Sequence, residues 1–222
     1  ASMNPDLFWG AVNSGFGYQY MQNMLNLNNG KIANSPSPNF SNISRLAGVA
    51  TTDWSWSPLF VDLDNDGWKD IFISNGTRRE INNKDYFDAL KKQNLTKDSL
   101  LSKTLAIPSE KIDNVVLKNN KDLTFSKAND KWGISYPGFS NGATYADLDN
   151  DGDLEIITNN IDDYASVFEN TSSDKNNYLT LRFNGPNKNK FGLGVKAIIN
   201  VNGMSQLQEM TLTRGFQSSV AP

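Results

Sequence analysis

The chain of 222 residues contains no cysteine and no histidine. The lack of cysteine excludes disulfide bonds, a thiolate nucleophile and cysteine-ligated zinc. The lack of histidine removes the commonest general base and the commonest ligand of transition metals. No apolar run approaches the roughly 20 residues that a membrane-spanning helix requires, so we expect no membrane span.

Positive charge is also scarce and scattered. The formal net charge is -3, and the concentrations of lysine, at Lys91-Lys92 and at residues 188–190, are short and lie in polar segments. Nucleic-acid binding usually requires a basic face, so we expect no nucleic-acid partner. The many asparagine, serine and threonine residues favour an exported protein. We expect it to be extracellular or at the cell surface, where association with an outer membrane is one option.

One nine-residue acidic pattern occurs twice, beginning at Asp62 and again at Asp147. Carboxylates occupy positions 1, 3, 5 and 9 around a glycine at position 6, which is how a tight loop wraps oxygen ligands around a hard cation such as Ca²⁺. Position 7 offers a backbone carbonyl in this arrangement. We call residues 62–70 the first acidic loop and residues 147–155 the second acidic loop. The predicted calcium ligands are Asp62, Asp64, Asp66, Trp68 and Asp70 in the first loop and Asp147, Asp149, Asp151, Asp153 and Glu155 in the second.

The acidic loops begin like EF-hand loops but differ from them downstream. An EF-hand requires a bidentate glutamate at position 12, where this chain has Ile73 and Thr158. Each loop is followed by β-branched and aromatic residues, which indicate a short strand rather than an exiting helix. Two alternatives to a structural calcium site remain open. One is an acidic turn without metal, and the other is a catalytic metal, which a loop saturated with protein oxygens disfavours.

The similarity between the two copies extends beyond the loops. Residues 56–61 align with 141–146 when the loops are superposed, and strand-like segments farther upstream also match, so a unit of about four short strands repeats. Repeats of this size and content are typical of propeller blades or of a related radial β array. The aligned pairs are 56–61 with 141–146, 24–30 with 115–120, and 40–43 with 123–126.

Two segments resemble known families. The sequence FSNGATYADLDNDGD at residues 139–153 resembles the FG-GAP or VCBS repeat of integrin-type β-propellers, in which a calcium loop lies between outer strands of a blade. The sequence GLGVKAIINVNG at residues 192–203, with the stretch through Arg214 to Ser219, resembles the ASPIC/UnbV domain. That domain follows such repeats in cartilage acidic protein and in bacterial secreted and VCBS-repeat surface proteins. The resemblance implies an architecture rather than an activity, because propellers host many functions.

The sequence therefore predicts a mainly β chain in two parts. Residues 1–177 are predicted to form part of a β-propeller of FG-GAP/VCBS blades. A helical insertion is expected at about 82–111, where leucine and aromatic residues recur at helical spacing and Thr96 can cap a helix. We interpret this apolar stripe as a packing surface. The expected core residues of the two blades are Trp56, Phe60, Phe72, Val116, Phe125 and Ile157.

Residues 178–222 are predicted to form a small antiparallel β module of the partial ASPIC/UnbV type. Apolar and polar residues alternate at 178–183 and at 195–201, and the dipeptide Asn202-Gly203 is a type I′ hairpin signal. The returning strand is expected at 206–212. Three strands are thus predicted for this module.

A closed propeller requires at least about four blades, and two repeats are visible here. We therefore expect a fragment of a larger surface protein, with the remaining blades supplied by the same protein or by another surface protein. The predicted function is a calcium-stabilised extracellular scaffold for binding or adhesion, with a protein or a glycan as ligand. Two alternatives are an accessory region of a secreted carbohydrate-active enzyme and a structural subunit of a surface complex. No catalytic constellation is visible, so we predict no catalytic residue and no enzyme activity.

Overall fold

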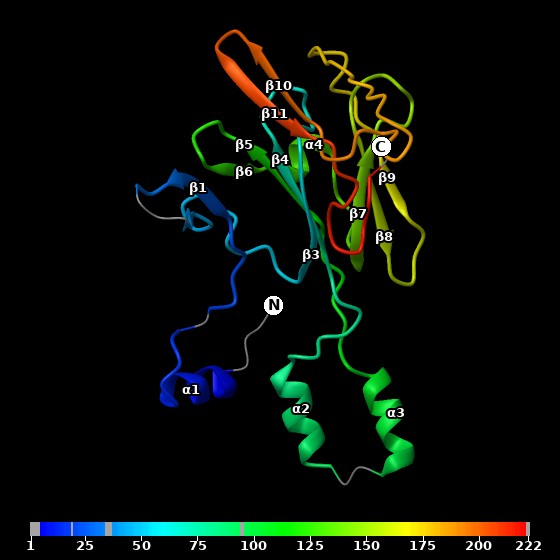
Figure 1. The fold of residues 1–222 in the computed structure, drawn as a ribbon. Coiled ribbons are helices and arrows are strands. Elements are labelled where there is room, and N and C mark those ends of the chain that lie inside the picture. Colours follow the sequence, from blue (N-terminus) through cyan, green and yellow to red (C-terminus); the bar gives the residue numbers. More distant parts are fainter. Residues whose placement is uncertain (1–4, 19, 34–36, 94–95, 221–222) are drawn as a thin grey trace.

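The computed structural model of the chain describes residues 5–18, 20–33, 37–93 and 96–220 (Figure 1). Strands make up 31% and helices 13% of the structure, which confirms the predicted mainly β class. The sheets are antiparallel, and no closed barrel or propeller is formed by the part of the chain that is described. Residues 1–4 of the predicted repeat region, residues 221–222 of the predicted β module and Leu95 of the predicted helical stripe lie outside the described residues.

Two larger antiparallel sheets carry the acidic loops. Each loop connects the first two strands of its sheet, so its position 9 begins a strand. The first sheet contains, in order, β3 (Ser55–Val61), β4 (Asp70–Asn75), β5 (Val115–Asn119) and β6 (Phe125–Lys127), and the second contains β7 (Ser140–Ala146), β8 (Glu155–Asn160) and β9 (Ser166–Phe168).

These sheets do not coincide with the repeat that the sequence suggests. β5 and β6 align with the start of the second copy, yet they complete the sheet that β3 and β4 begin. The pairing of Ile71 with Leu117 is matched by the pairing of Ile156 with Phe168, so β9 is the equivalent of β5. The predicted grouping of strands is therefore wrong. A helical insertion separates β4 from β5 but not β8 from β9, and it destroys the regular spacing on which the alignment depends.

The main apolar core lies between the two larger sheets, where β3 runs beside β7 (Figure 1). Phe72 and Val116 are 0% exposed there, which confirms two of the predicted core residues. Trp56, Phe125 and Ile157 are only half-buried. The buried members of this core are Leu59, Val61, Leu63, Phe72, Val116, Ala128, Ile134, Ala143 and Ile156.

Phe60 is the clearest error among the predicted core residues, because 42% of it is exposed. Its neighbours Leu59 and Val61 are the buried residues of β3. Successive side chains of a strand point to opposite faces, so the prediction places the core on the wrong face of β3.

A second apolar cluster covers the other face of the first sheet. Ala47 and Val49 pack there against Ile71, Ile73 and Leu117. They follow the small sheet of β1 (Asn26–Lys31) and β2 (Pro38–Asn42) along the chain. Every residue of β4 is buried, because both faces of this strand are covered.

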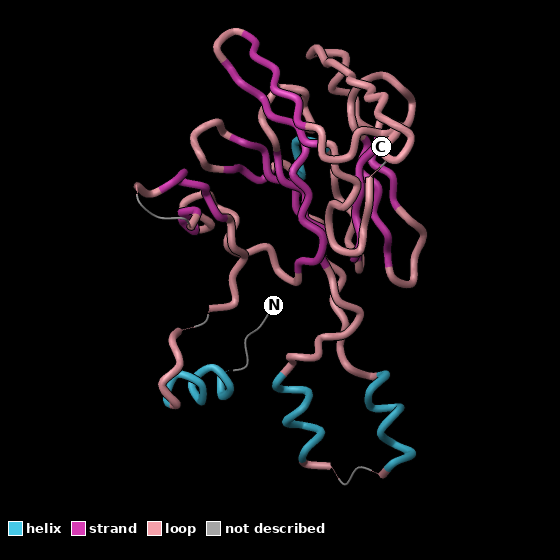
Figure 2. Tube along the Cα trace, viewed as in Figure 1, coloured by secondary structure: helices cyan, strands magenta, loops and turns pink. Residues whose placement is uncertain are grey.

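The helical insertion is confirmed as α2 (Lys84–Lys91) and α3 (Lys97–Leu105), which project away from the sheets (Figure 2). Thr96 caps α3 as predicted, since its hydroxyl accepts a hydrogen bond from the Ser99 backbone N–H at 3.3 Å. The predicted packing role of the stripe is wrong for Leu101, which is 67% exposed.

The remaining helices are α1 (Pro5–Asn13) and the single turn α4 (Asn129–Trp132). No described helix is long and apolar enough to span a bilayer.

The C-terminal part contains one hairpin, β10 (Lys196–Val201) paired with β11 (Met204–Glu209). Asn202 and Gly203 have φ angles of 49° and 80°, as a type I′ turn requires, so the predicted hairpin is confirmed. The strand predicted at 178–183 does not form. That segment is irregular chain, and its alternating pattern pairs with no strand of the described structure.

Candidate metal centres

The two acidic loops fold in the same way because positions 4 and 6 adopt left-handed backbone conformations. The φ angles are 53° at Asn65 and 89° at Gly67, and 65° at Asn150 and 91° at Gly152. Asparagine and glycine are the residues that tolerate this conformation best. In the first loop the turn lets the Asp62 carboxylate accept the backbone N–H groups of Asp66 at 3.1 Å and of Gly67 at 2.8 Å.

Position 9 closes each loop against its sheet. The Asp70 carboxylate accepts the backbone N–H of Leu63 at 3.1 Å and that of Asn119, on the neighbouring strand β5, at 2.9 Å. The Glu155 carboxylate accepts the backbone N–H of Leu148 at 2.7 Å. Asp70 is 0% and Glu155 is 4% exposed. These two buried side chains therefore hold the loops in place through hydrogen bonds, and they are also predicted ligands.

Each loop gathers three carboxylates. One oxygen from each of Asp62, Asp64 and Asp70 lies within 4.8 Å of the others. The same holds in the second loop for the residues at positions 1, 3 and 5, namely Asp147, Asp149 and Asp151. Both clusters could hold a metal ion. The two clusters differ in membership, since position 9 belongs to the first and position 5 to the second.

Burial makes the carboxylate charge in these loops costly. Removal from water raises the pKa of Asp70 to about 6, in spite of its two backbone hydrogen bonds. Burial likewise raises the pKa of Asp62 and of Glu155, and neighbouring loop carboxylates add to the effect. A bound divalent cation would reverse this balance, because it favours the ionised form of every carboxylate around it.

Four buried carboxylate oxygens in the loops accept no hydrogen bond. They are Asp64 Oδ1 in the first loop and Asp147 Oδ1, Asp153 Oδ1 and Glu155 Oε1 in the second. A buried acceptor without a partner costs free energy, and native proteins rarely leave one unsatisfied. A hard cation would satisfy these oxygens by direct coordination. The residues present thus fit an oxygen-ligated metal ion.

Position 5 of the first loop lies outside the carboxylate cluster, and the carbonyl of position 7 stays a predicted ligand. Asp66 is not in the three-carboxylate cluster: its Oδ2 is paired with the ammonium groups of Lys118 at 3.0 Å and Lys121 at 3.2 Å. Burial acts to raise the pKa of Asp66, but the hydrogen bonds from Lys118, Trp68 and Lys121 outweigh burial and lower it. The Trp68 side chain is 38% exposed, and its backbone N–H donates to Asp66 Oδ1 at 3.0 Å.

Asp153, at position 7 of the second loop, was predicted to contribute only its carbonyl oxygen. Its side chain is 0% exposed, and its Oδ2 accepts the backbone N–H of Ser173 at 2.9 Å. The Ser173 hydroxyl also donates to Asp151 Oδ2 at 2.7 Å, and this hydrogen bond lowers the pKa of Asp151. The second loop therefore has a fifth carboxyl group, itself buried, that the spacing rule does not assign as a side-chain ligand.

Two asparagines support the loops, Asn119 from the end of β5 and Asn170 from the residues just after β9. Asn119 Nδ2 donates to the Lys69 carbonyl at 3.0 Å, and Asn170 Nδ2 donates to the Leu154 carbonyl at 3.2 Å, which is the same loop position. Each asparagine stands two residues after the matching residues Leu117 and Phe168. This shared position is the signal that could have found them, but the helical insertion hides it from a constant-offset alignment.

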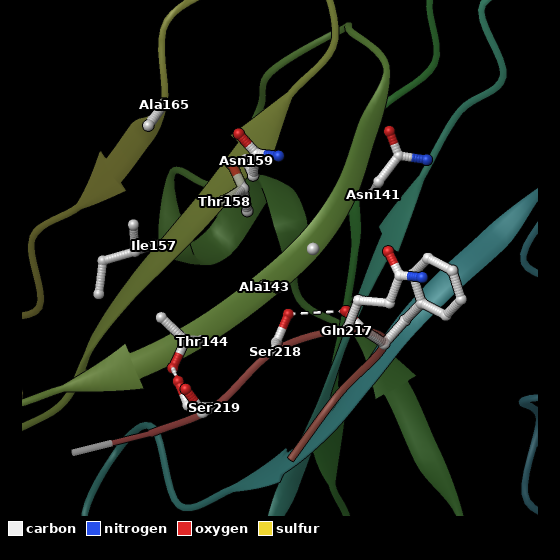
Figure 3. A pocket seen from close by; sticks show the side chains of 12 residues that line it. Asn141, Ala143, Thr144, Ile157, Thr158, Asn159, Ala165, Gln217, Ser218 and Ser219 are labelled. Carbon is white, nitrogen blue, oxygen red and sulfur yellow. Dashed lines mark hydrogen bonds between the residues drawn. The ribbon is translucent and has the colours of Figure 1, made fainter. Parts of the chain in front are cut away.

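A separate pocket of about 270 Å³ lies on the second sheet (Figure 3). Strands β7 and β8 form its floor, and residues 216–219 form a wall, fixed where Thr144 Oγ1 donates to the Ser219 carbonyl at 2.7 Å. None of the described lining residues carries an ionisable side chain, so the pocket offers no acid–base pair. The polar lining residues are Asn141, Thr144, Thr158, Asn159, Gln217, Ser218 and Ser219.

Comparison of the chain with models of protein families and with curated proteins finds no match.

Proposed function

We propose that this chain is a calcium-stabilised binding or adhesion scaffold of an exported protein built from FG-GAP/VCBS-type blades. The observation that carries the proposal is the duplicated acidic loop with buried carboxylate oxygens that lack a hydrogen-bond donor. Such oxygens in a tight loop are the ligand set of Ca²⁺. The chain has neither cysteine nor histidine, which are the side chains that favour zinc and other transition metals.

The position of the loops supports a structural role for the ion. Asn65 Nδ2, in the first loop, donates to the Gly152 carbonyl in the second at 3.2 Å. Asn170 Nδ2, which supports the second loop, also donates to the Leu63 carbonyl in the first at 2.8 Å. Ions that rigidify these loops would therefore fix the two sheets relative to one another. A loop that surrounds its ion with protein oxygens leaves no open position for a substrate.

The arrangement of the sheets supports a propeller assignment. β3 and β7, the first strands of their sheets, run side by side, as the first strands of adjacent blades do around a propeller axis. Further blades, from the same protein or from another surface protein, would complete the array. The pocket on the second sheet supports a binding role, because its amides and hydroxyls suit a neutral polar ligand such as a glycan.

Metal analysis of the purified chain tests the calcium part of this proposal. After dialysis against calcium and removal of free ion, we expect bound calcium, and we expect less of it in Asp149→Asn. Asp85→Asn, which alters an exposed residue of α2, is the matched control and should retain the wild-type content. A protein that retains no calcium contradicts the proposal.

A glycan-binding assay tests the ligand. Binding to immobilised neutral glycans that disappears in Asn159→Leu would support a glycan ligand, and hydrolysis of those glycans would favour the enzyme alternative.

A further inference from the structure

We infer that the two acidic loops are not equivalent metal sites: Lys118 supplies the first loop with its own cation, and the second loop is the site that calcium fills first. This inference rests on the proposed function, because it concerns how the two calcium loops share the ion.

The first loop already contains a positive charge. The Lys118 ammonium forms an ion pair with Asp64 and lies 3.0 Å from Asp66 Oδ2. Lys121 adds a second ammonium 3.2 Å from the same Asp66 oxygen. Two of the four acidic side chains of this loop are thus neutralised by lysine. A single oxygen of the loop, Asp64 Oδ1, is buried without a hydrogen-bond donor.

The fold holds Lys118 in this position. It follows Leu117 in β5, and Leu117 pairs with Ile71 of β4, so the lysine lies beside Asp70 at the mouth of the loop. Its ammonium also lies 5.8 Å from the centre of the Trp132 ring, a distance at which a cation is attracted to the ring face. The side chain is only 27% exposed. The surrounding residues therefore restrict the ammonium group to a position near the loop.

The second loop has no such cation. The pairing of Ile156 with Phe168 places Glu169 at the position that matches Lys118, so the substitution replaces a positive charge with a negative one. Among the described residues, no lysine or arginine forms an ion pair with a carboxylate of the second loop. Its buried oxygens without a donor belong to Asp147, Asp153 and Glu155.

The difference in charge predicts a difference in affinity. Calcium can enter the second loop without displacing a lysine, and the carboxyl groups of Asp147, Asp149 and Asp151 lie close enough together to share it. Calcium can enter the first loop only if the Lys118 ammonium leaves Asp64 and Asp66, or if it tolerates a like charge at close range. We therefore expect calcium to bind the first loop at least about tenfold more weakly, a factor that corresponds to about 1.4 kcal/mol.

Calorimetric calcium titration of the full chain tests this assignment. The wild type should show one tight site and a second site at least tenfold weaker. Lys118→Met keeps the length of the side chain without its charge and should strengthen the weak site about tenfold or more. Lys118→Arg keeps the charge and should leave that site weak. Lys127→Met, an exposed lysine of β6 outside the loops, is the matched control and should behave like the wild type.

Asp149→Asn identifies which site is which, because it should remove the tight site and leave the weak one. Circular dichroism confirms that each variant is folded before titration. Two sites of equal affinity in the wild type, or a weak site that Lys118→Met does not strengthen, would overturn the inference while leaving the proposed function intact. Failure of every protein to bind calcium would contradict the proposed function itself.

Discussion

At the scale of single residues, position 9 of each loop combines two roles that conflict in the absence of a cation. Asp70 and Glu155 fasten their loops to the sheet through backbone N–H groups, which requires burial. Burial in turn penalises the ionised form that binds metal. The conflict is resolved only when positive charge enters the loop. Calcium can supply it in both loops, and Lys118 supplies part of it in the first.

This conflict predicts how stability depends on pH. Asp70 has a pKa of about 6 in the folded chain and a value near 3.8 when unfolded. A raised pKa in the folded state means that the stability contributed by this group is present below about pH 4 and is lost as the pH rises through about 6. In the presence of a chelator, the melting temperature should therefore fall across this window. The increase in melting temperature caused by calcium should grow across the same window, because calcium binds the ionised carboxylates.

Thermal unfolding between pH 4 and pH 7, with chelator and with calcium, measures both trends. Asp70→Asn is the comparison that isolates the residue, because an amide does not titrate and the decline with pH should be smaller. An identical decline in Asp70→Asn and in the wild type would assign it to other groups.

The clustering of carboxylates could be predicted from the sequence because it depends only on local spacing. The nine-residue pattern brings Asp62 and Asp64 together whatever the rest of the chain does. Lys118 and Asn170 could not be predicted in this way. Lys118 reaches the first loop from β5 and Asn170 reaches the second from the residues after β9, and neither strand pairing is visible in a local pattern.

At the scale of elements, the sequence predicts the hairpins and helices better than the faces they bury. The turn at Asn202-Gly203 and the cap at Thr96 are local signals, and both form as predicted. The face of β3 is not a local property. Both Phe60 and Leu59 are apolar, and only the arrival of the second sheet against β3 decides which of them is buried.

The helical insertion should be dispensable for the metal centres. α2 has no buried residue, and the insertion leaves the sheet after β4, at the opposite end of that strand from the first acidic loop. The Tyr86 hydroxyl donates to the Lys103 carbonyl, so the two helices lie close enough for a short glycine–serine linker to replace residues 84–105. We expect such a deletion to lose helical circular dichroism and to keep the calcium affinity of the full chain. A large loss of affinity would show that the insertion supports the loops.

At the scale of the whole molecule, the acidic loops lie beneath the C-terminal part of the chain. A Cβ atom added to Gly67 would come within 2.5 Å of Met204 Cε in β11, and one added to Gly152 would come within 2.1 Å of the Tyr178 ring. Asn176 Nδ2 also donates to the Asp64 carbonyl at 2.7 Å. The loops thus contact the C-terminal part of the chain at Asn176, Tyr178 and Met204. Well-ordered acidic loops should therefore hold the C-terminal part of the chain more firmly than mobile ones.

Removal of calcium should therefore loosen the C-terminal part more than the core. Hydrogen exchange with and without chelator measures this, and we expect faster exchange in β10 and β11 while the buried strand β4 stays protected. The helices of the insertion serve as an internal control, because they touch neither loop in the described structure and should exchange equally fast in both conditions. Equal hydrogen exchange of β10 and β11 with and without chelator would show that the packing of this hairpin does not depend on the metal.

The central claim is that the folded chain binds calcium in its acidic loops, and thermal unfolding tests it most directly. An ion that binds only the folded state stabilises it by about 2.7 kcal/mol per site at a concentration of 100 times Kd. For a chain of this size, one filled site should raise the melting temperature by about 5–10 °C. Calcium should produce this rise, a chelator should reverse it, and Asp149→Asn should remove most of it. A melting temperature that is the same in calcium and in chelator would contradict the account.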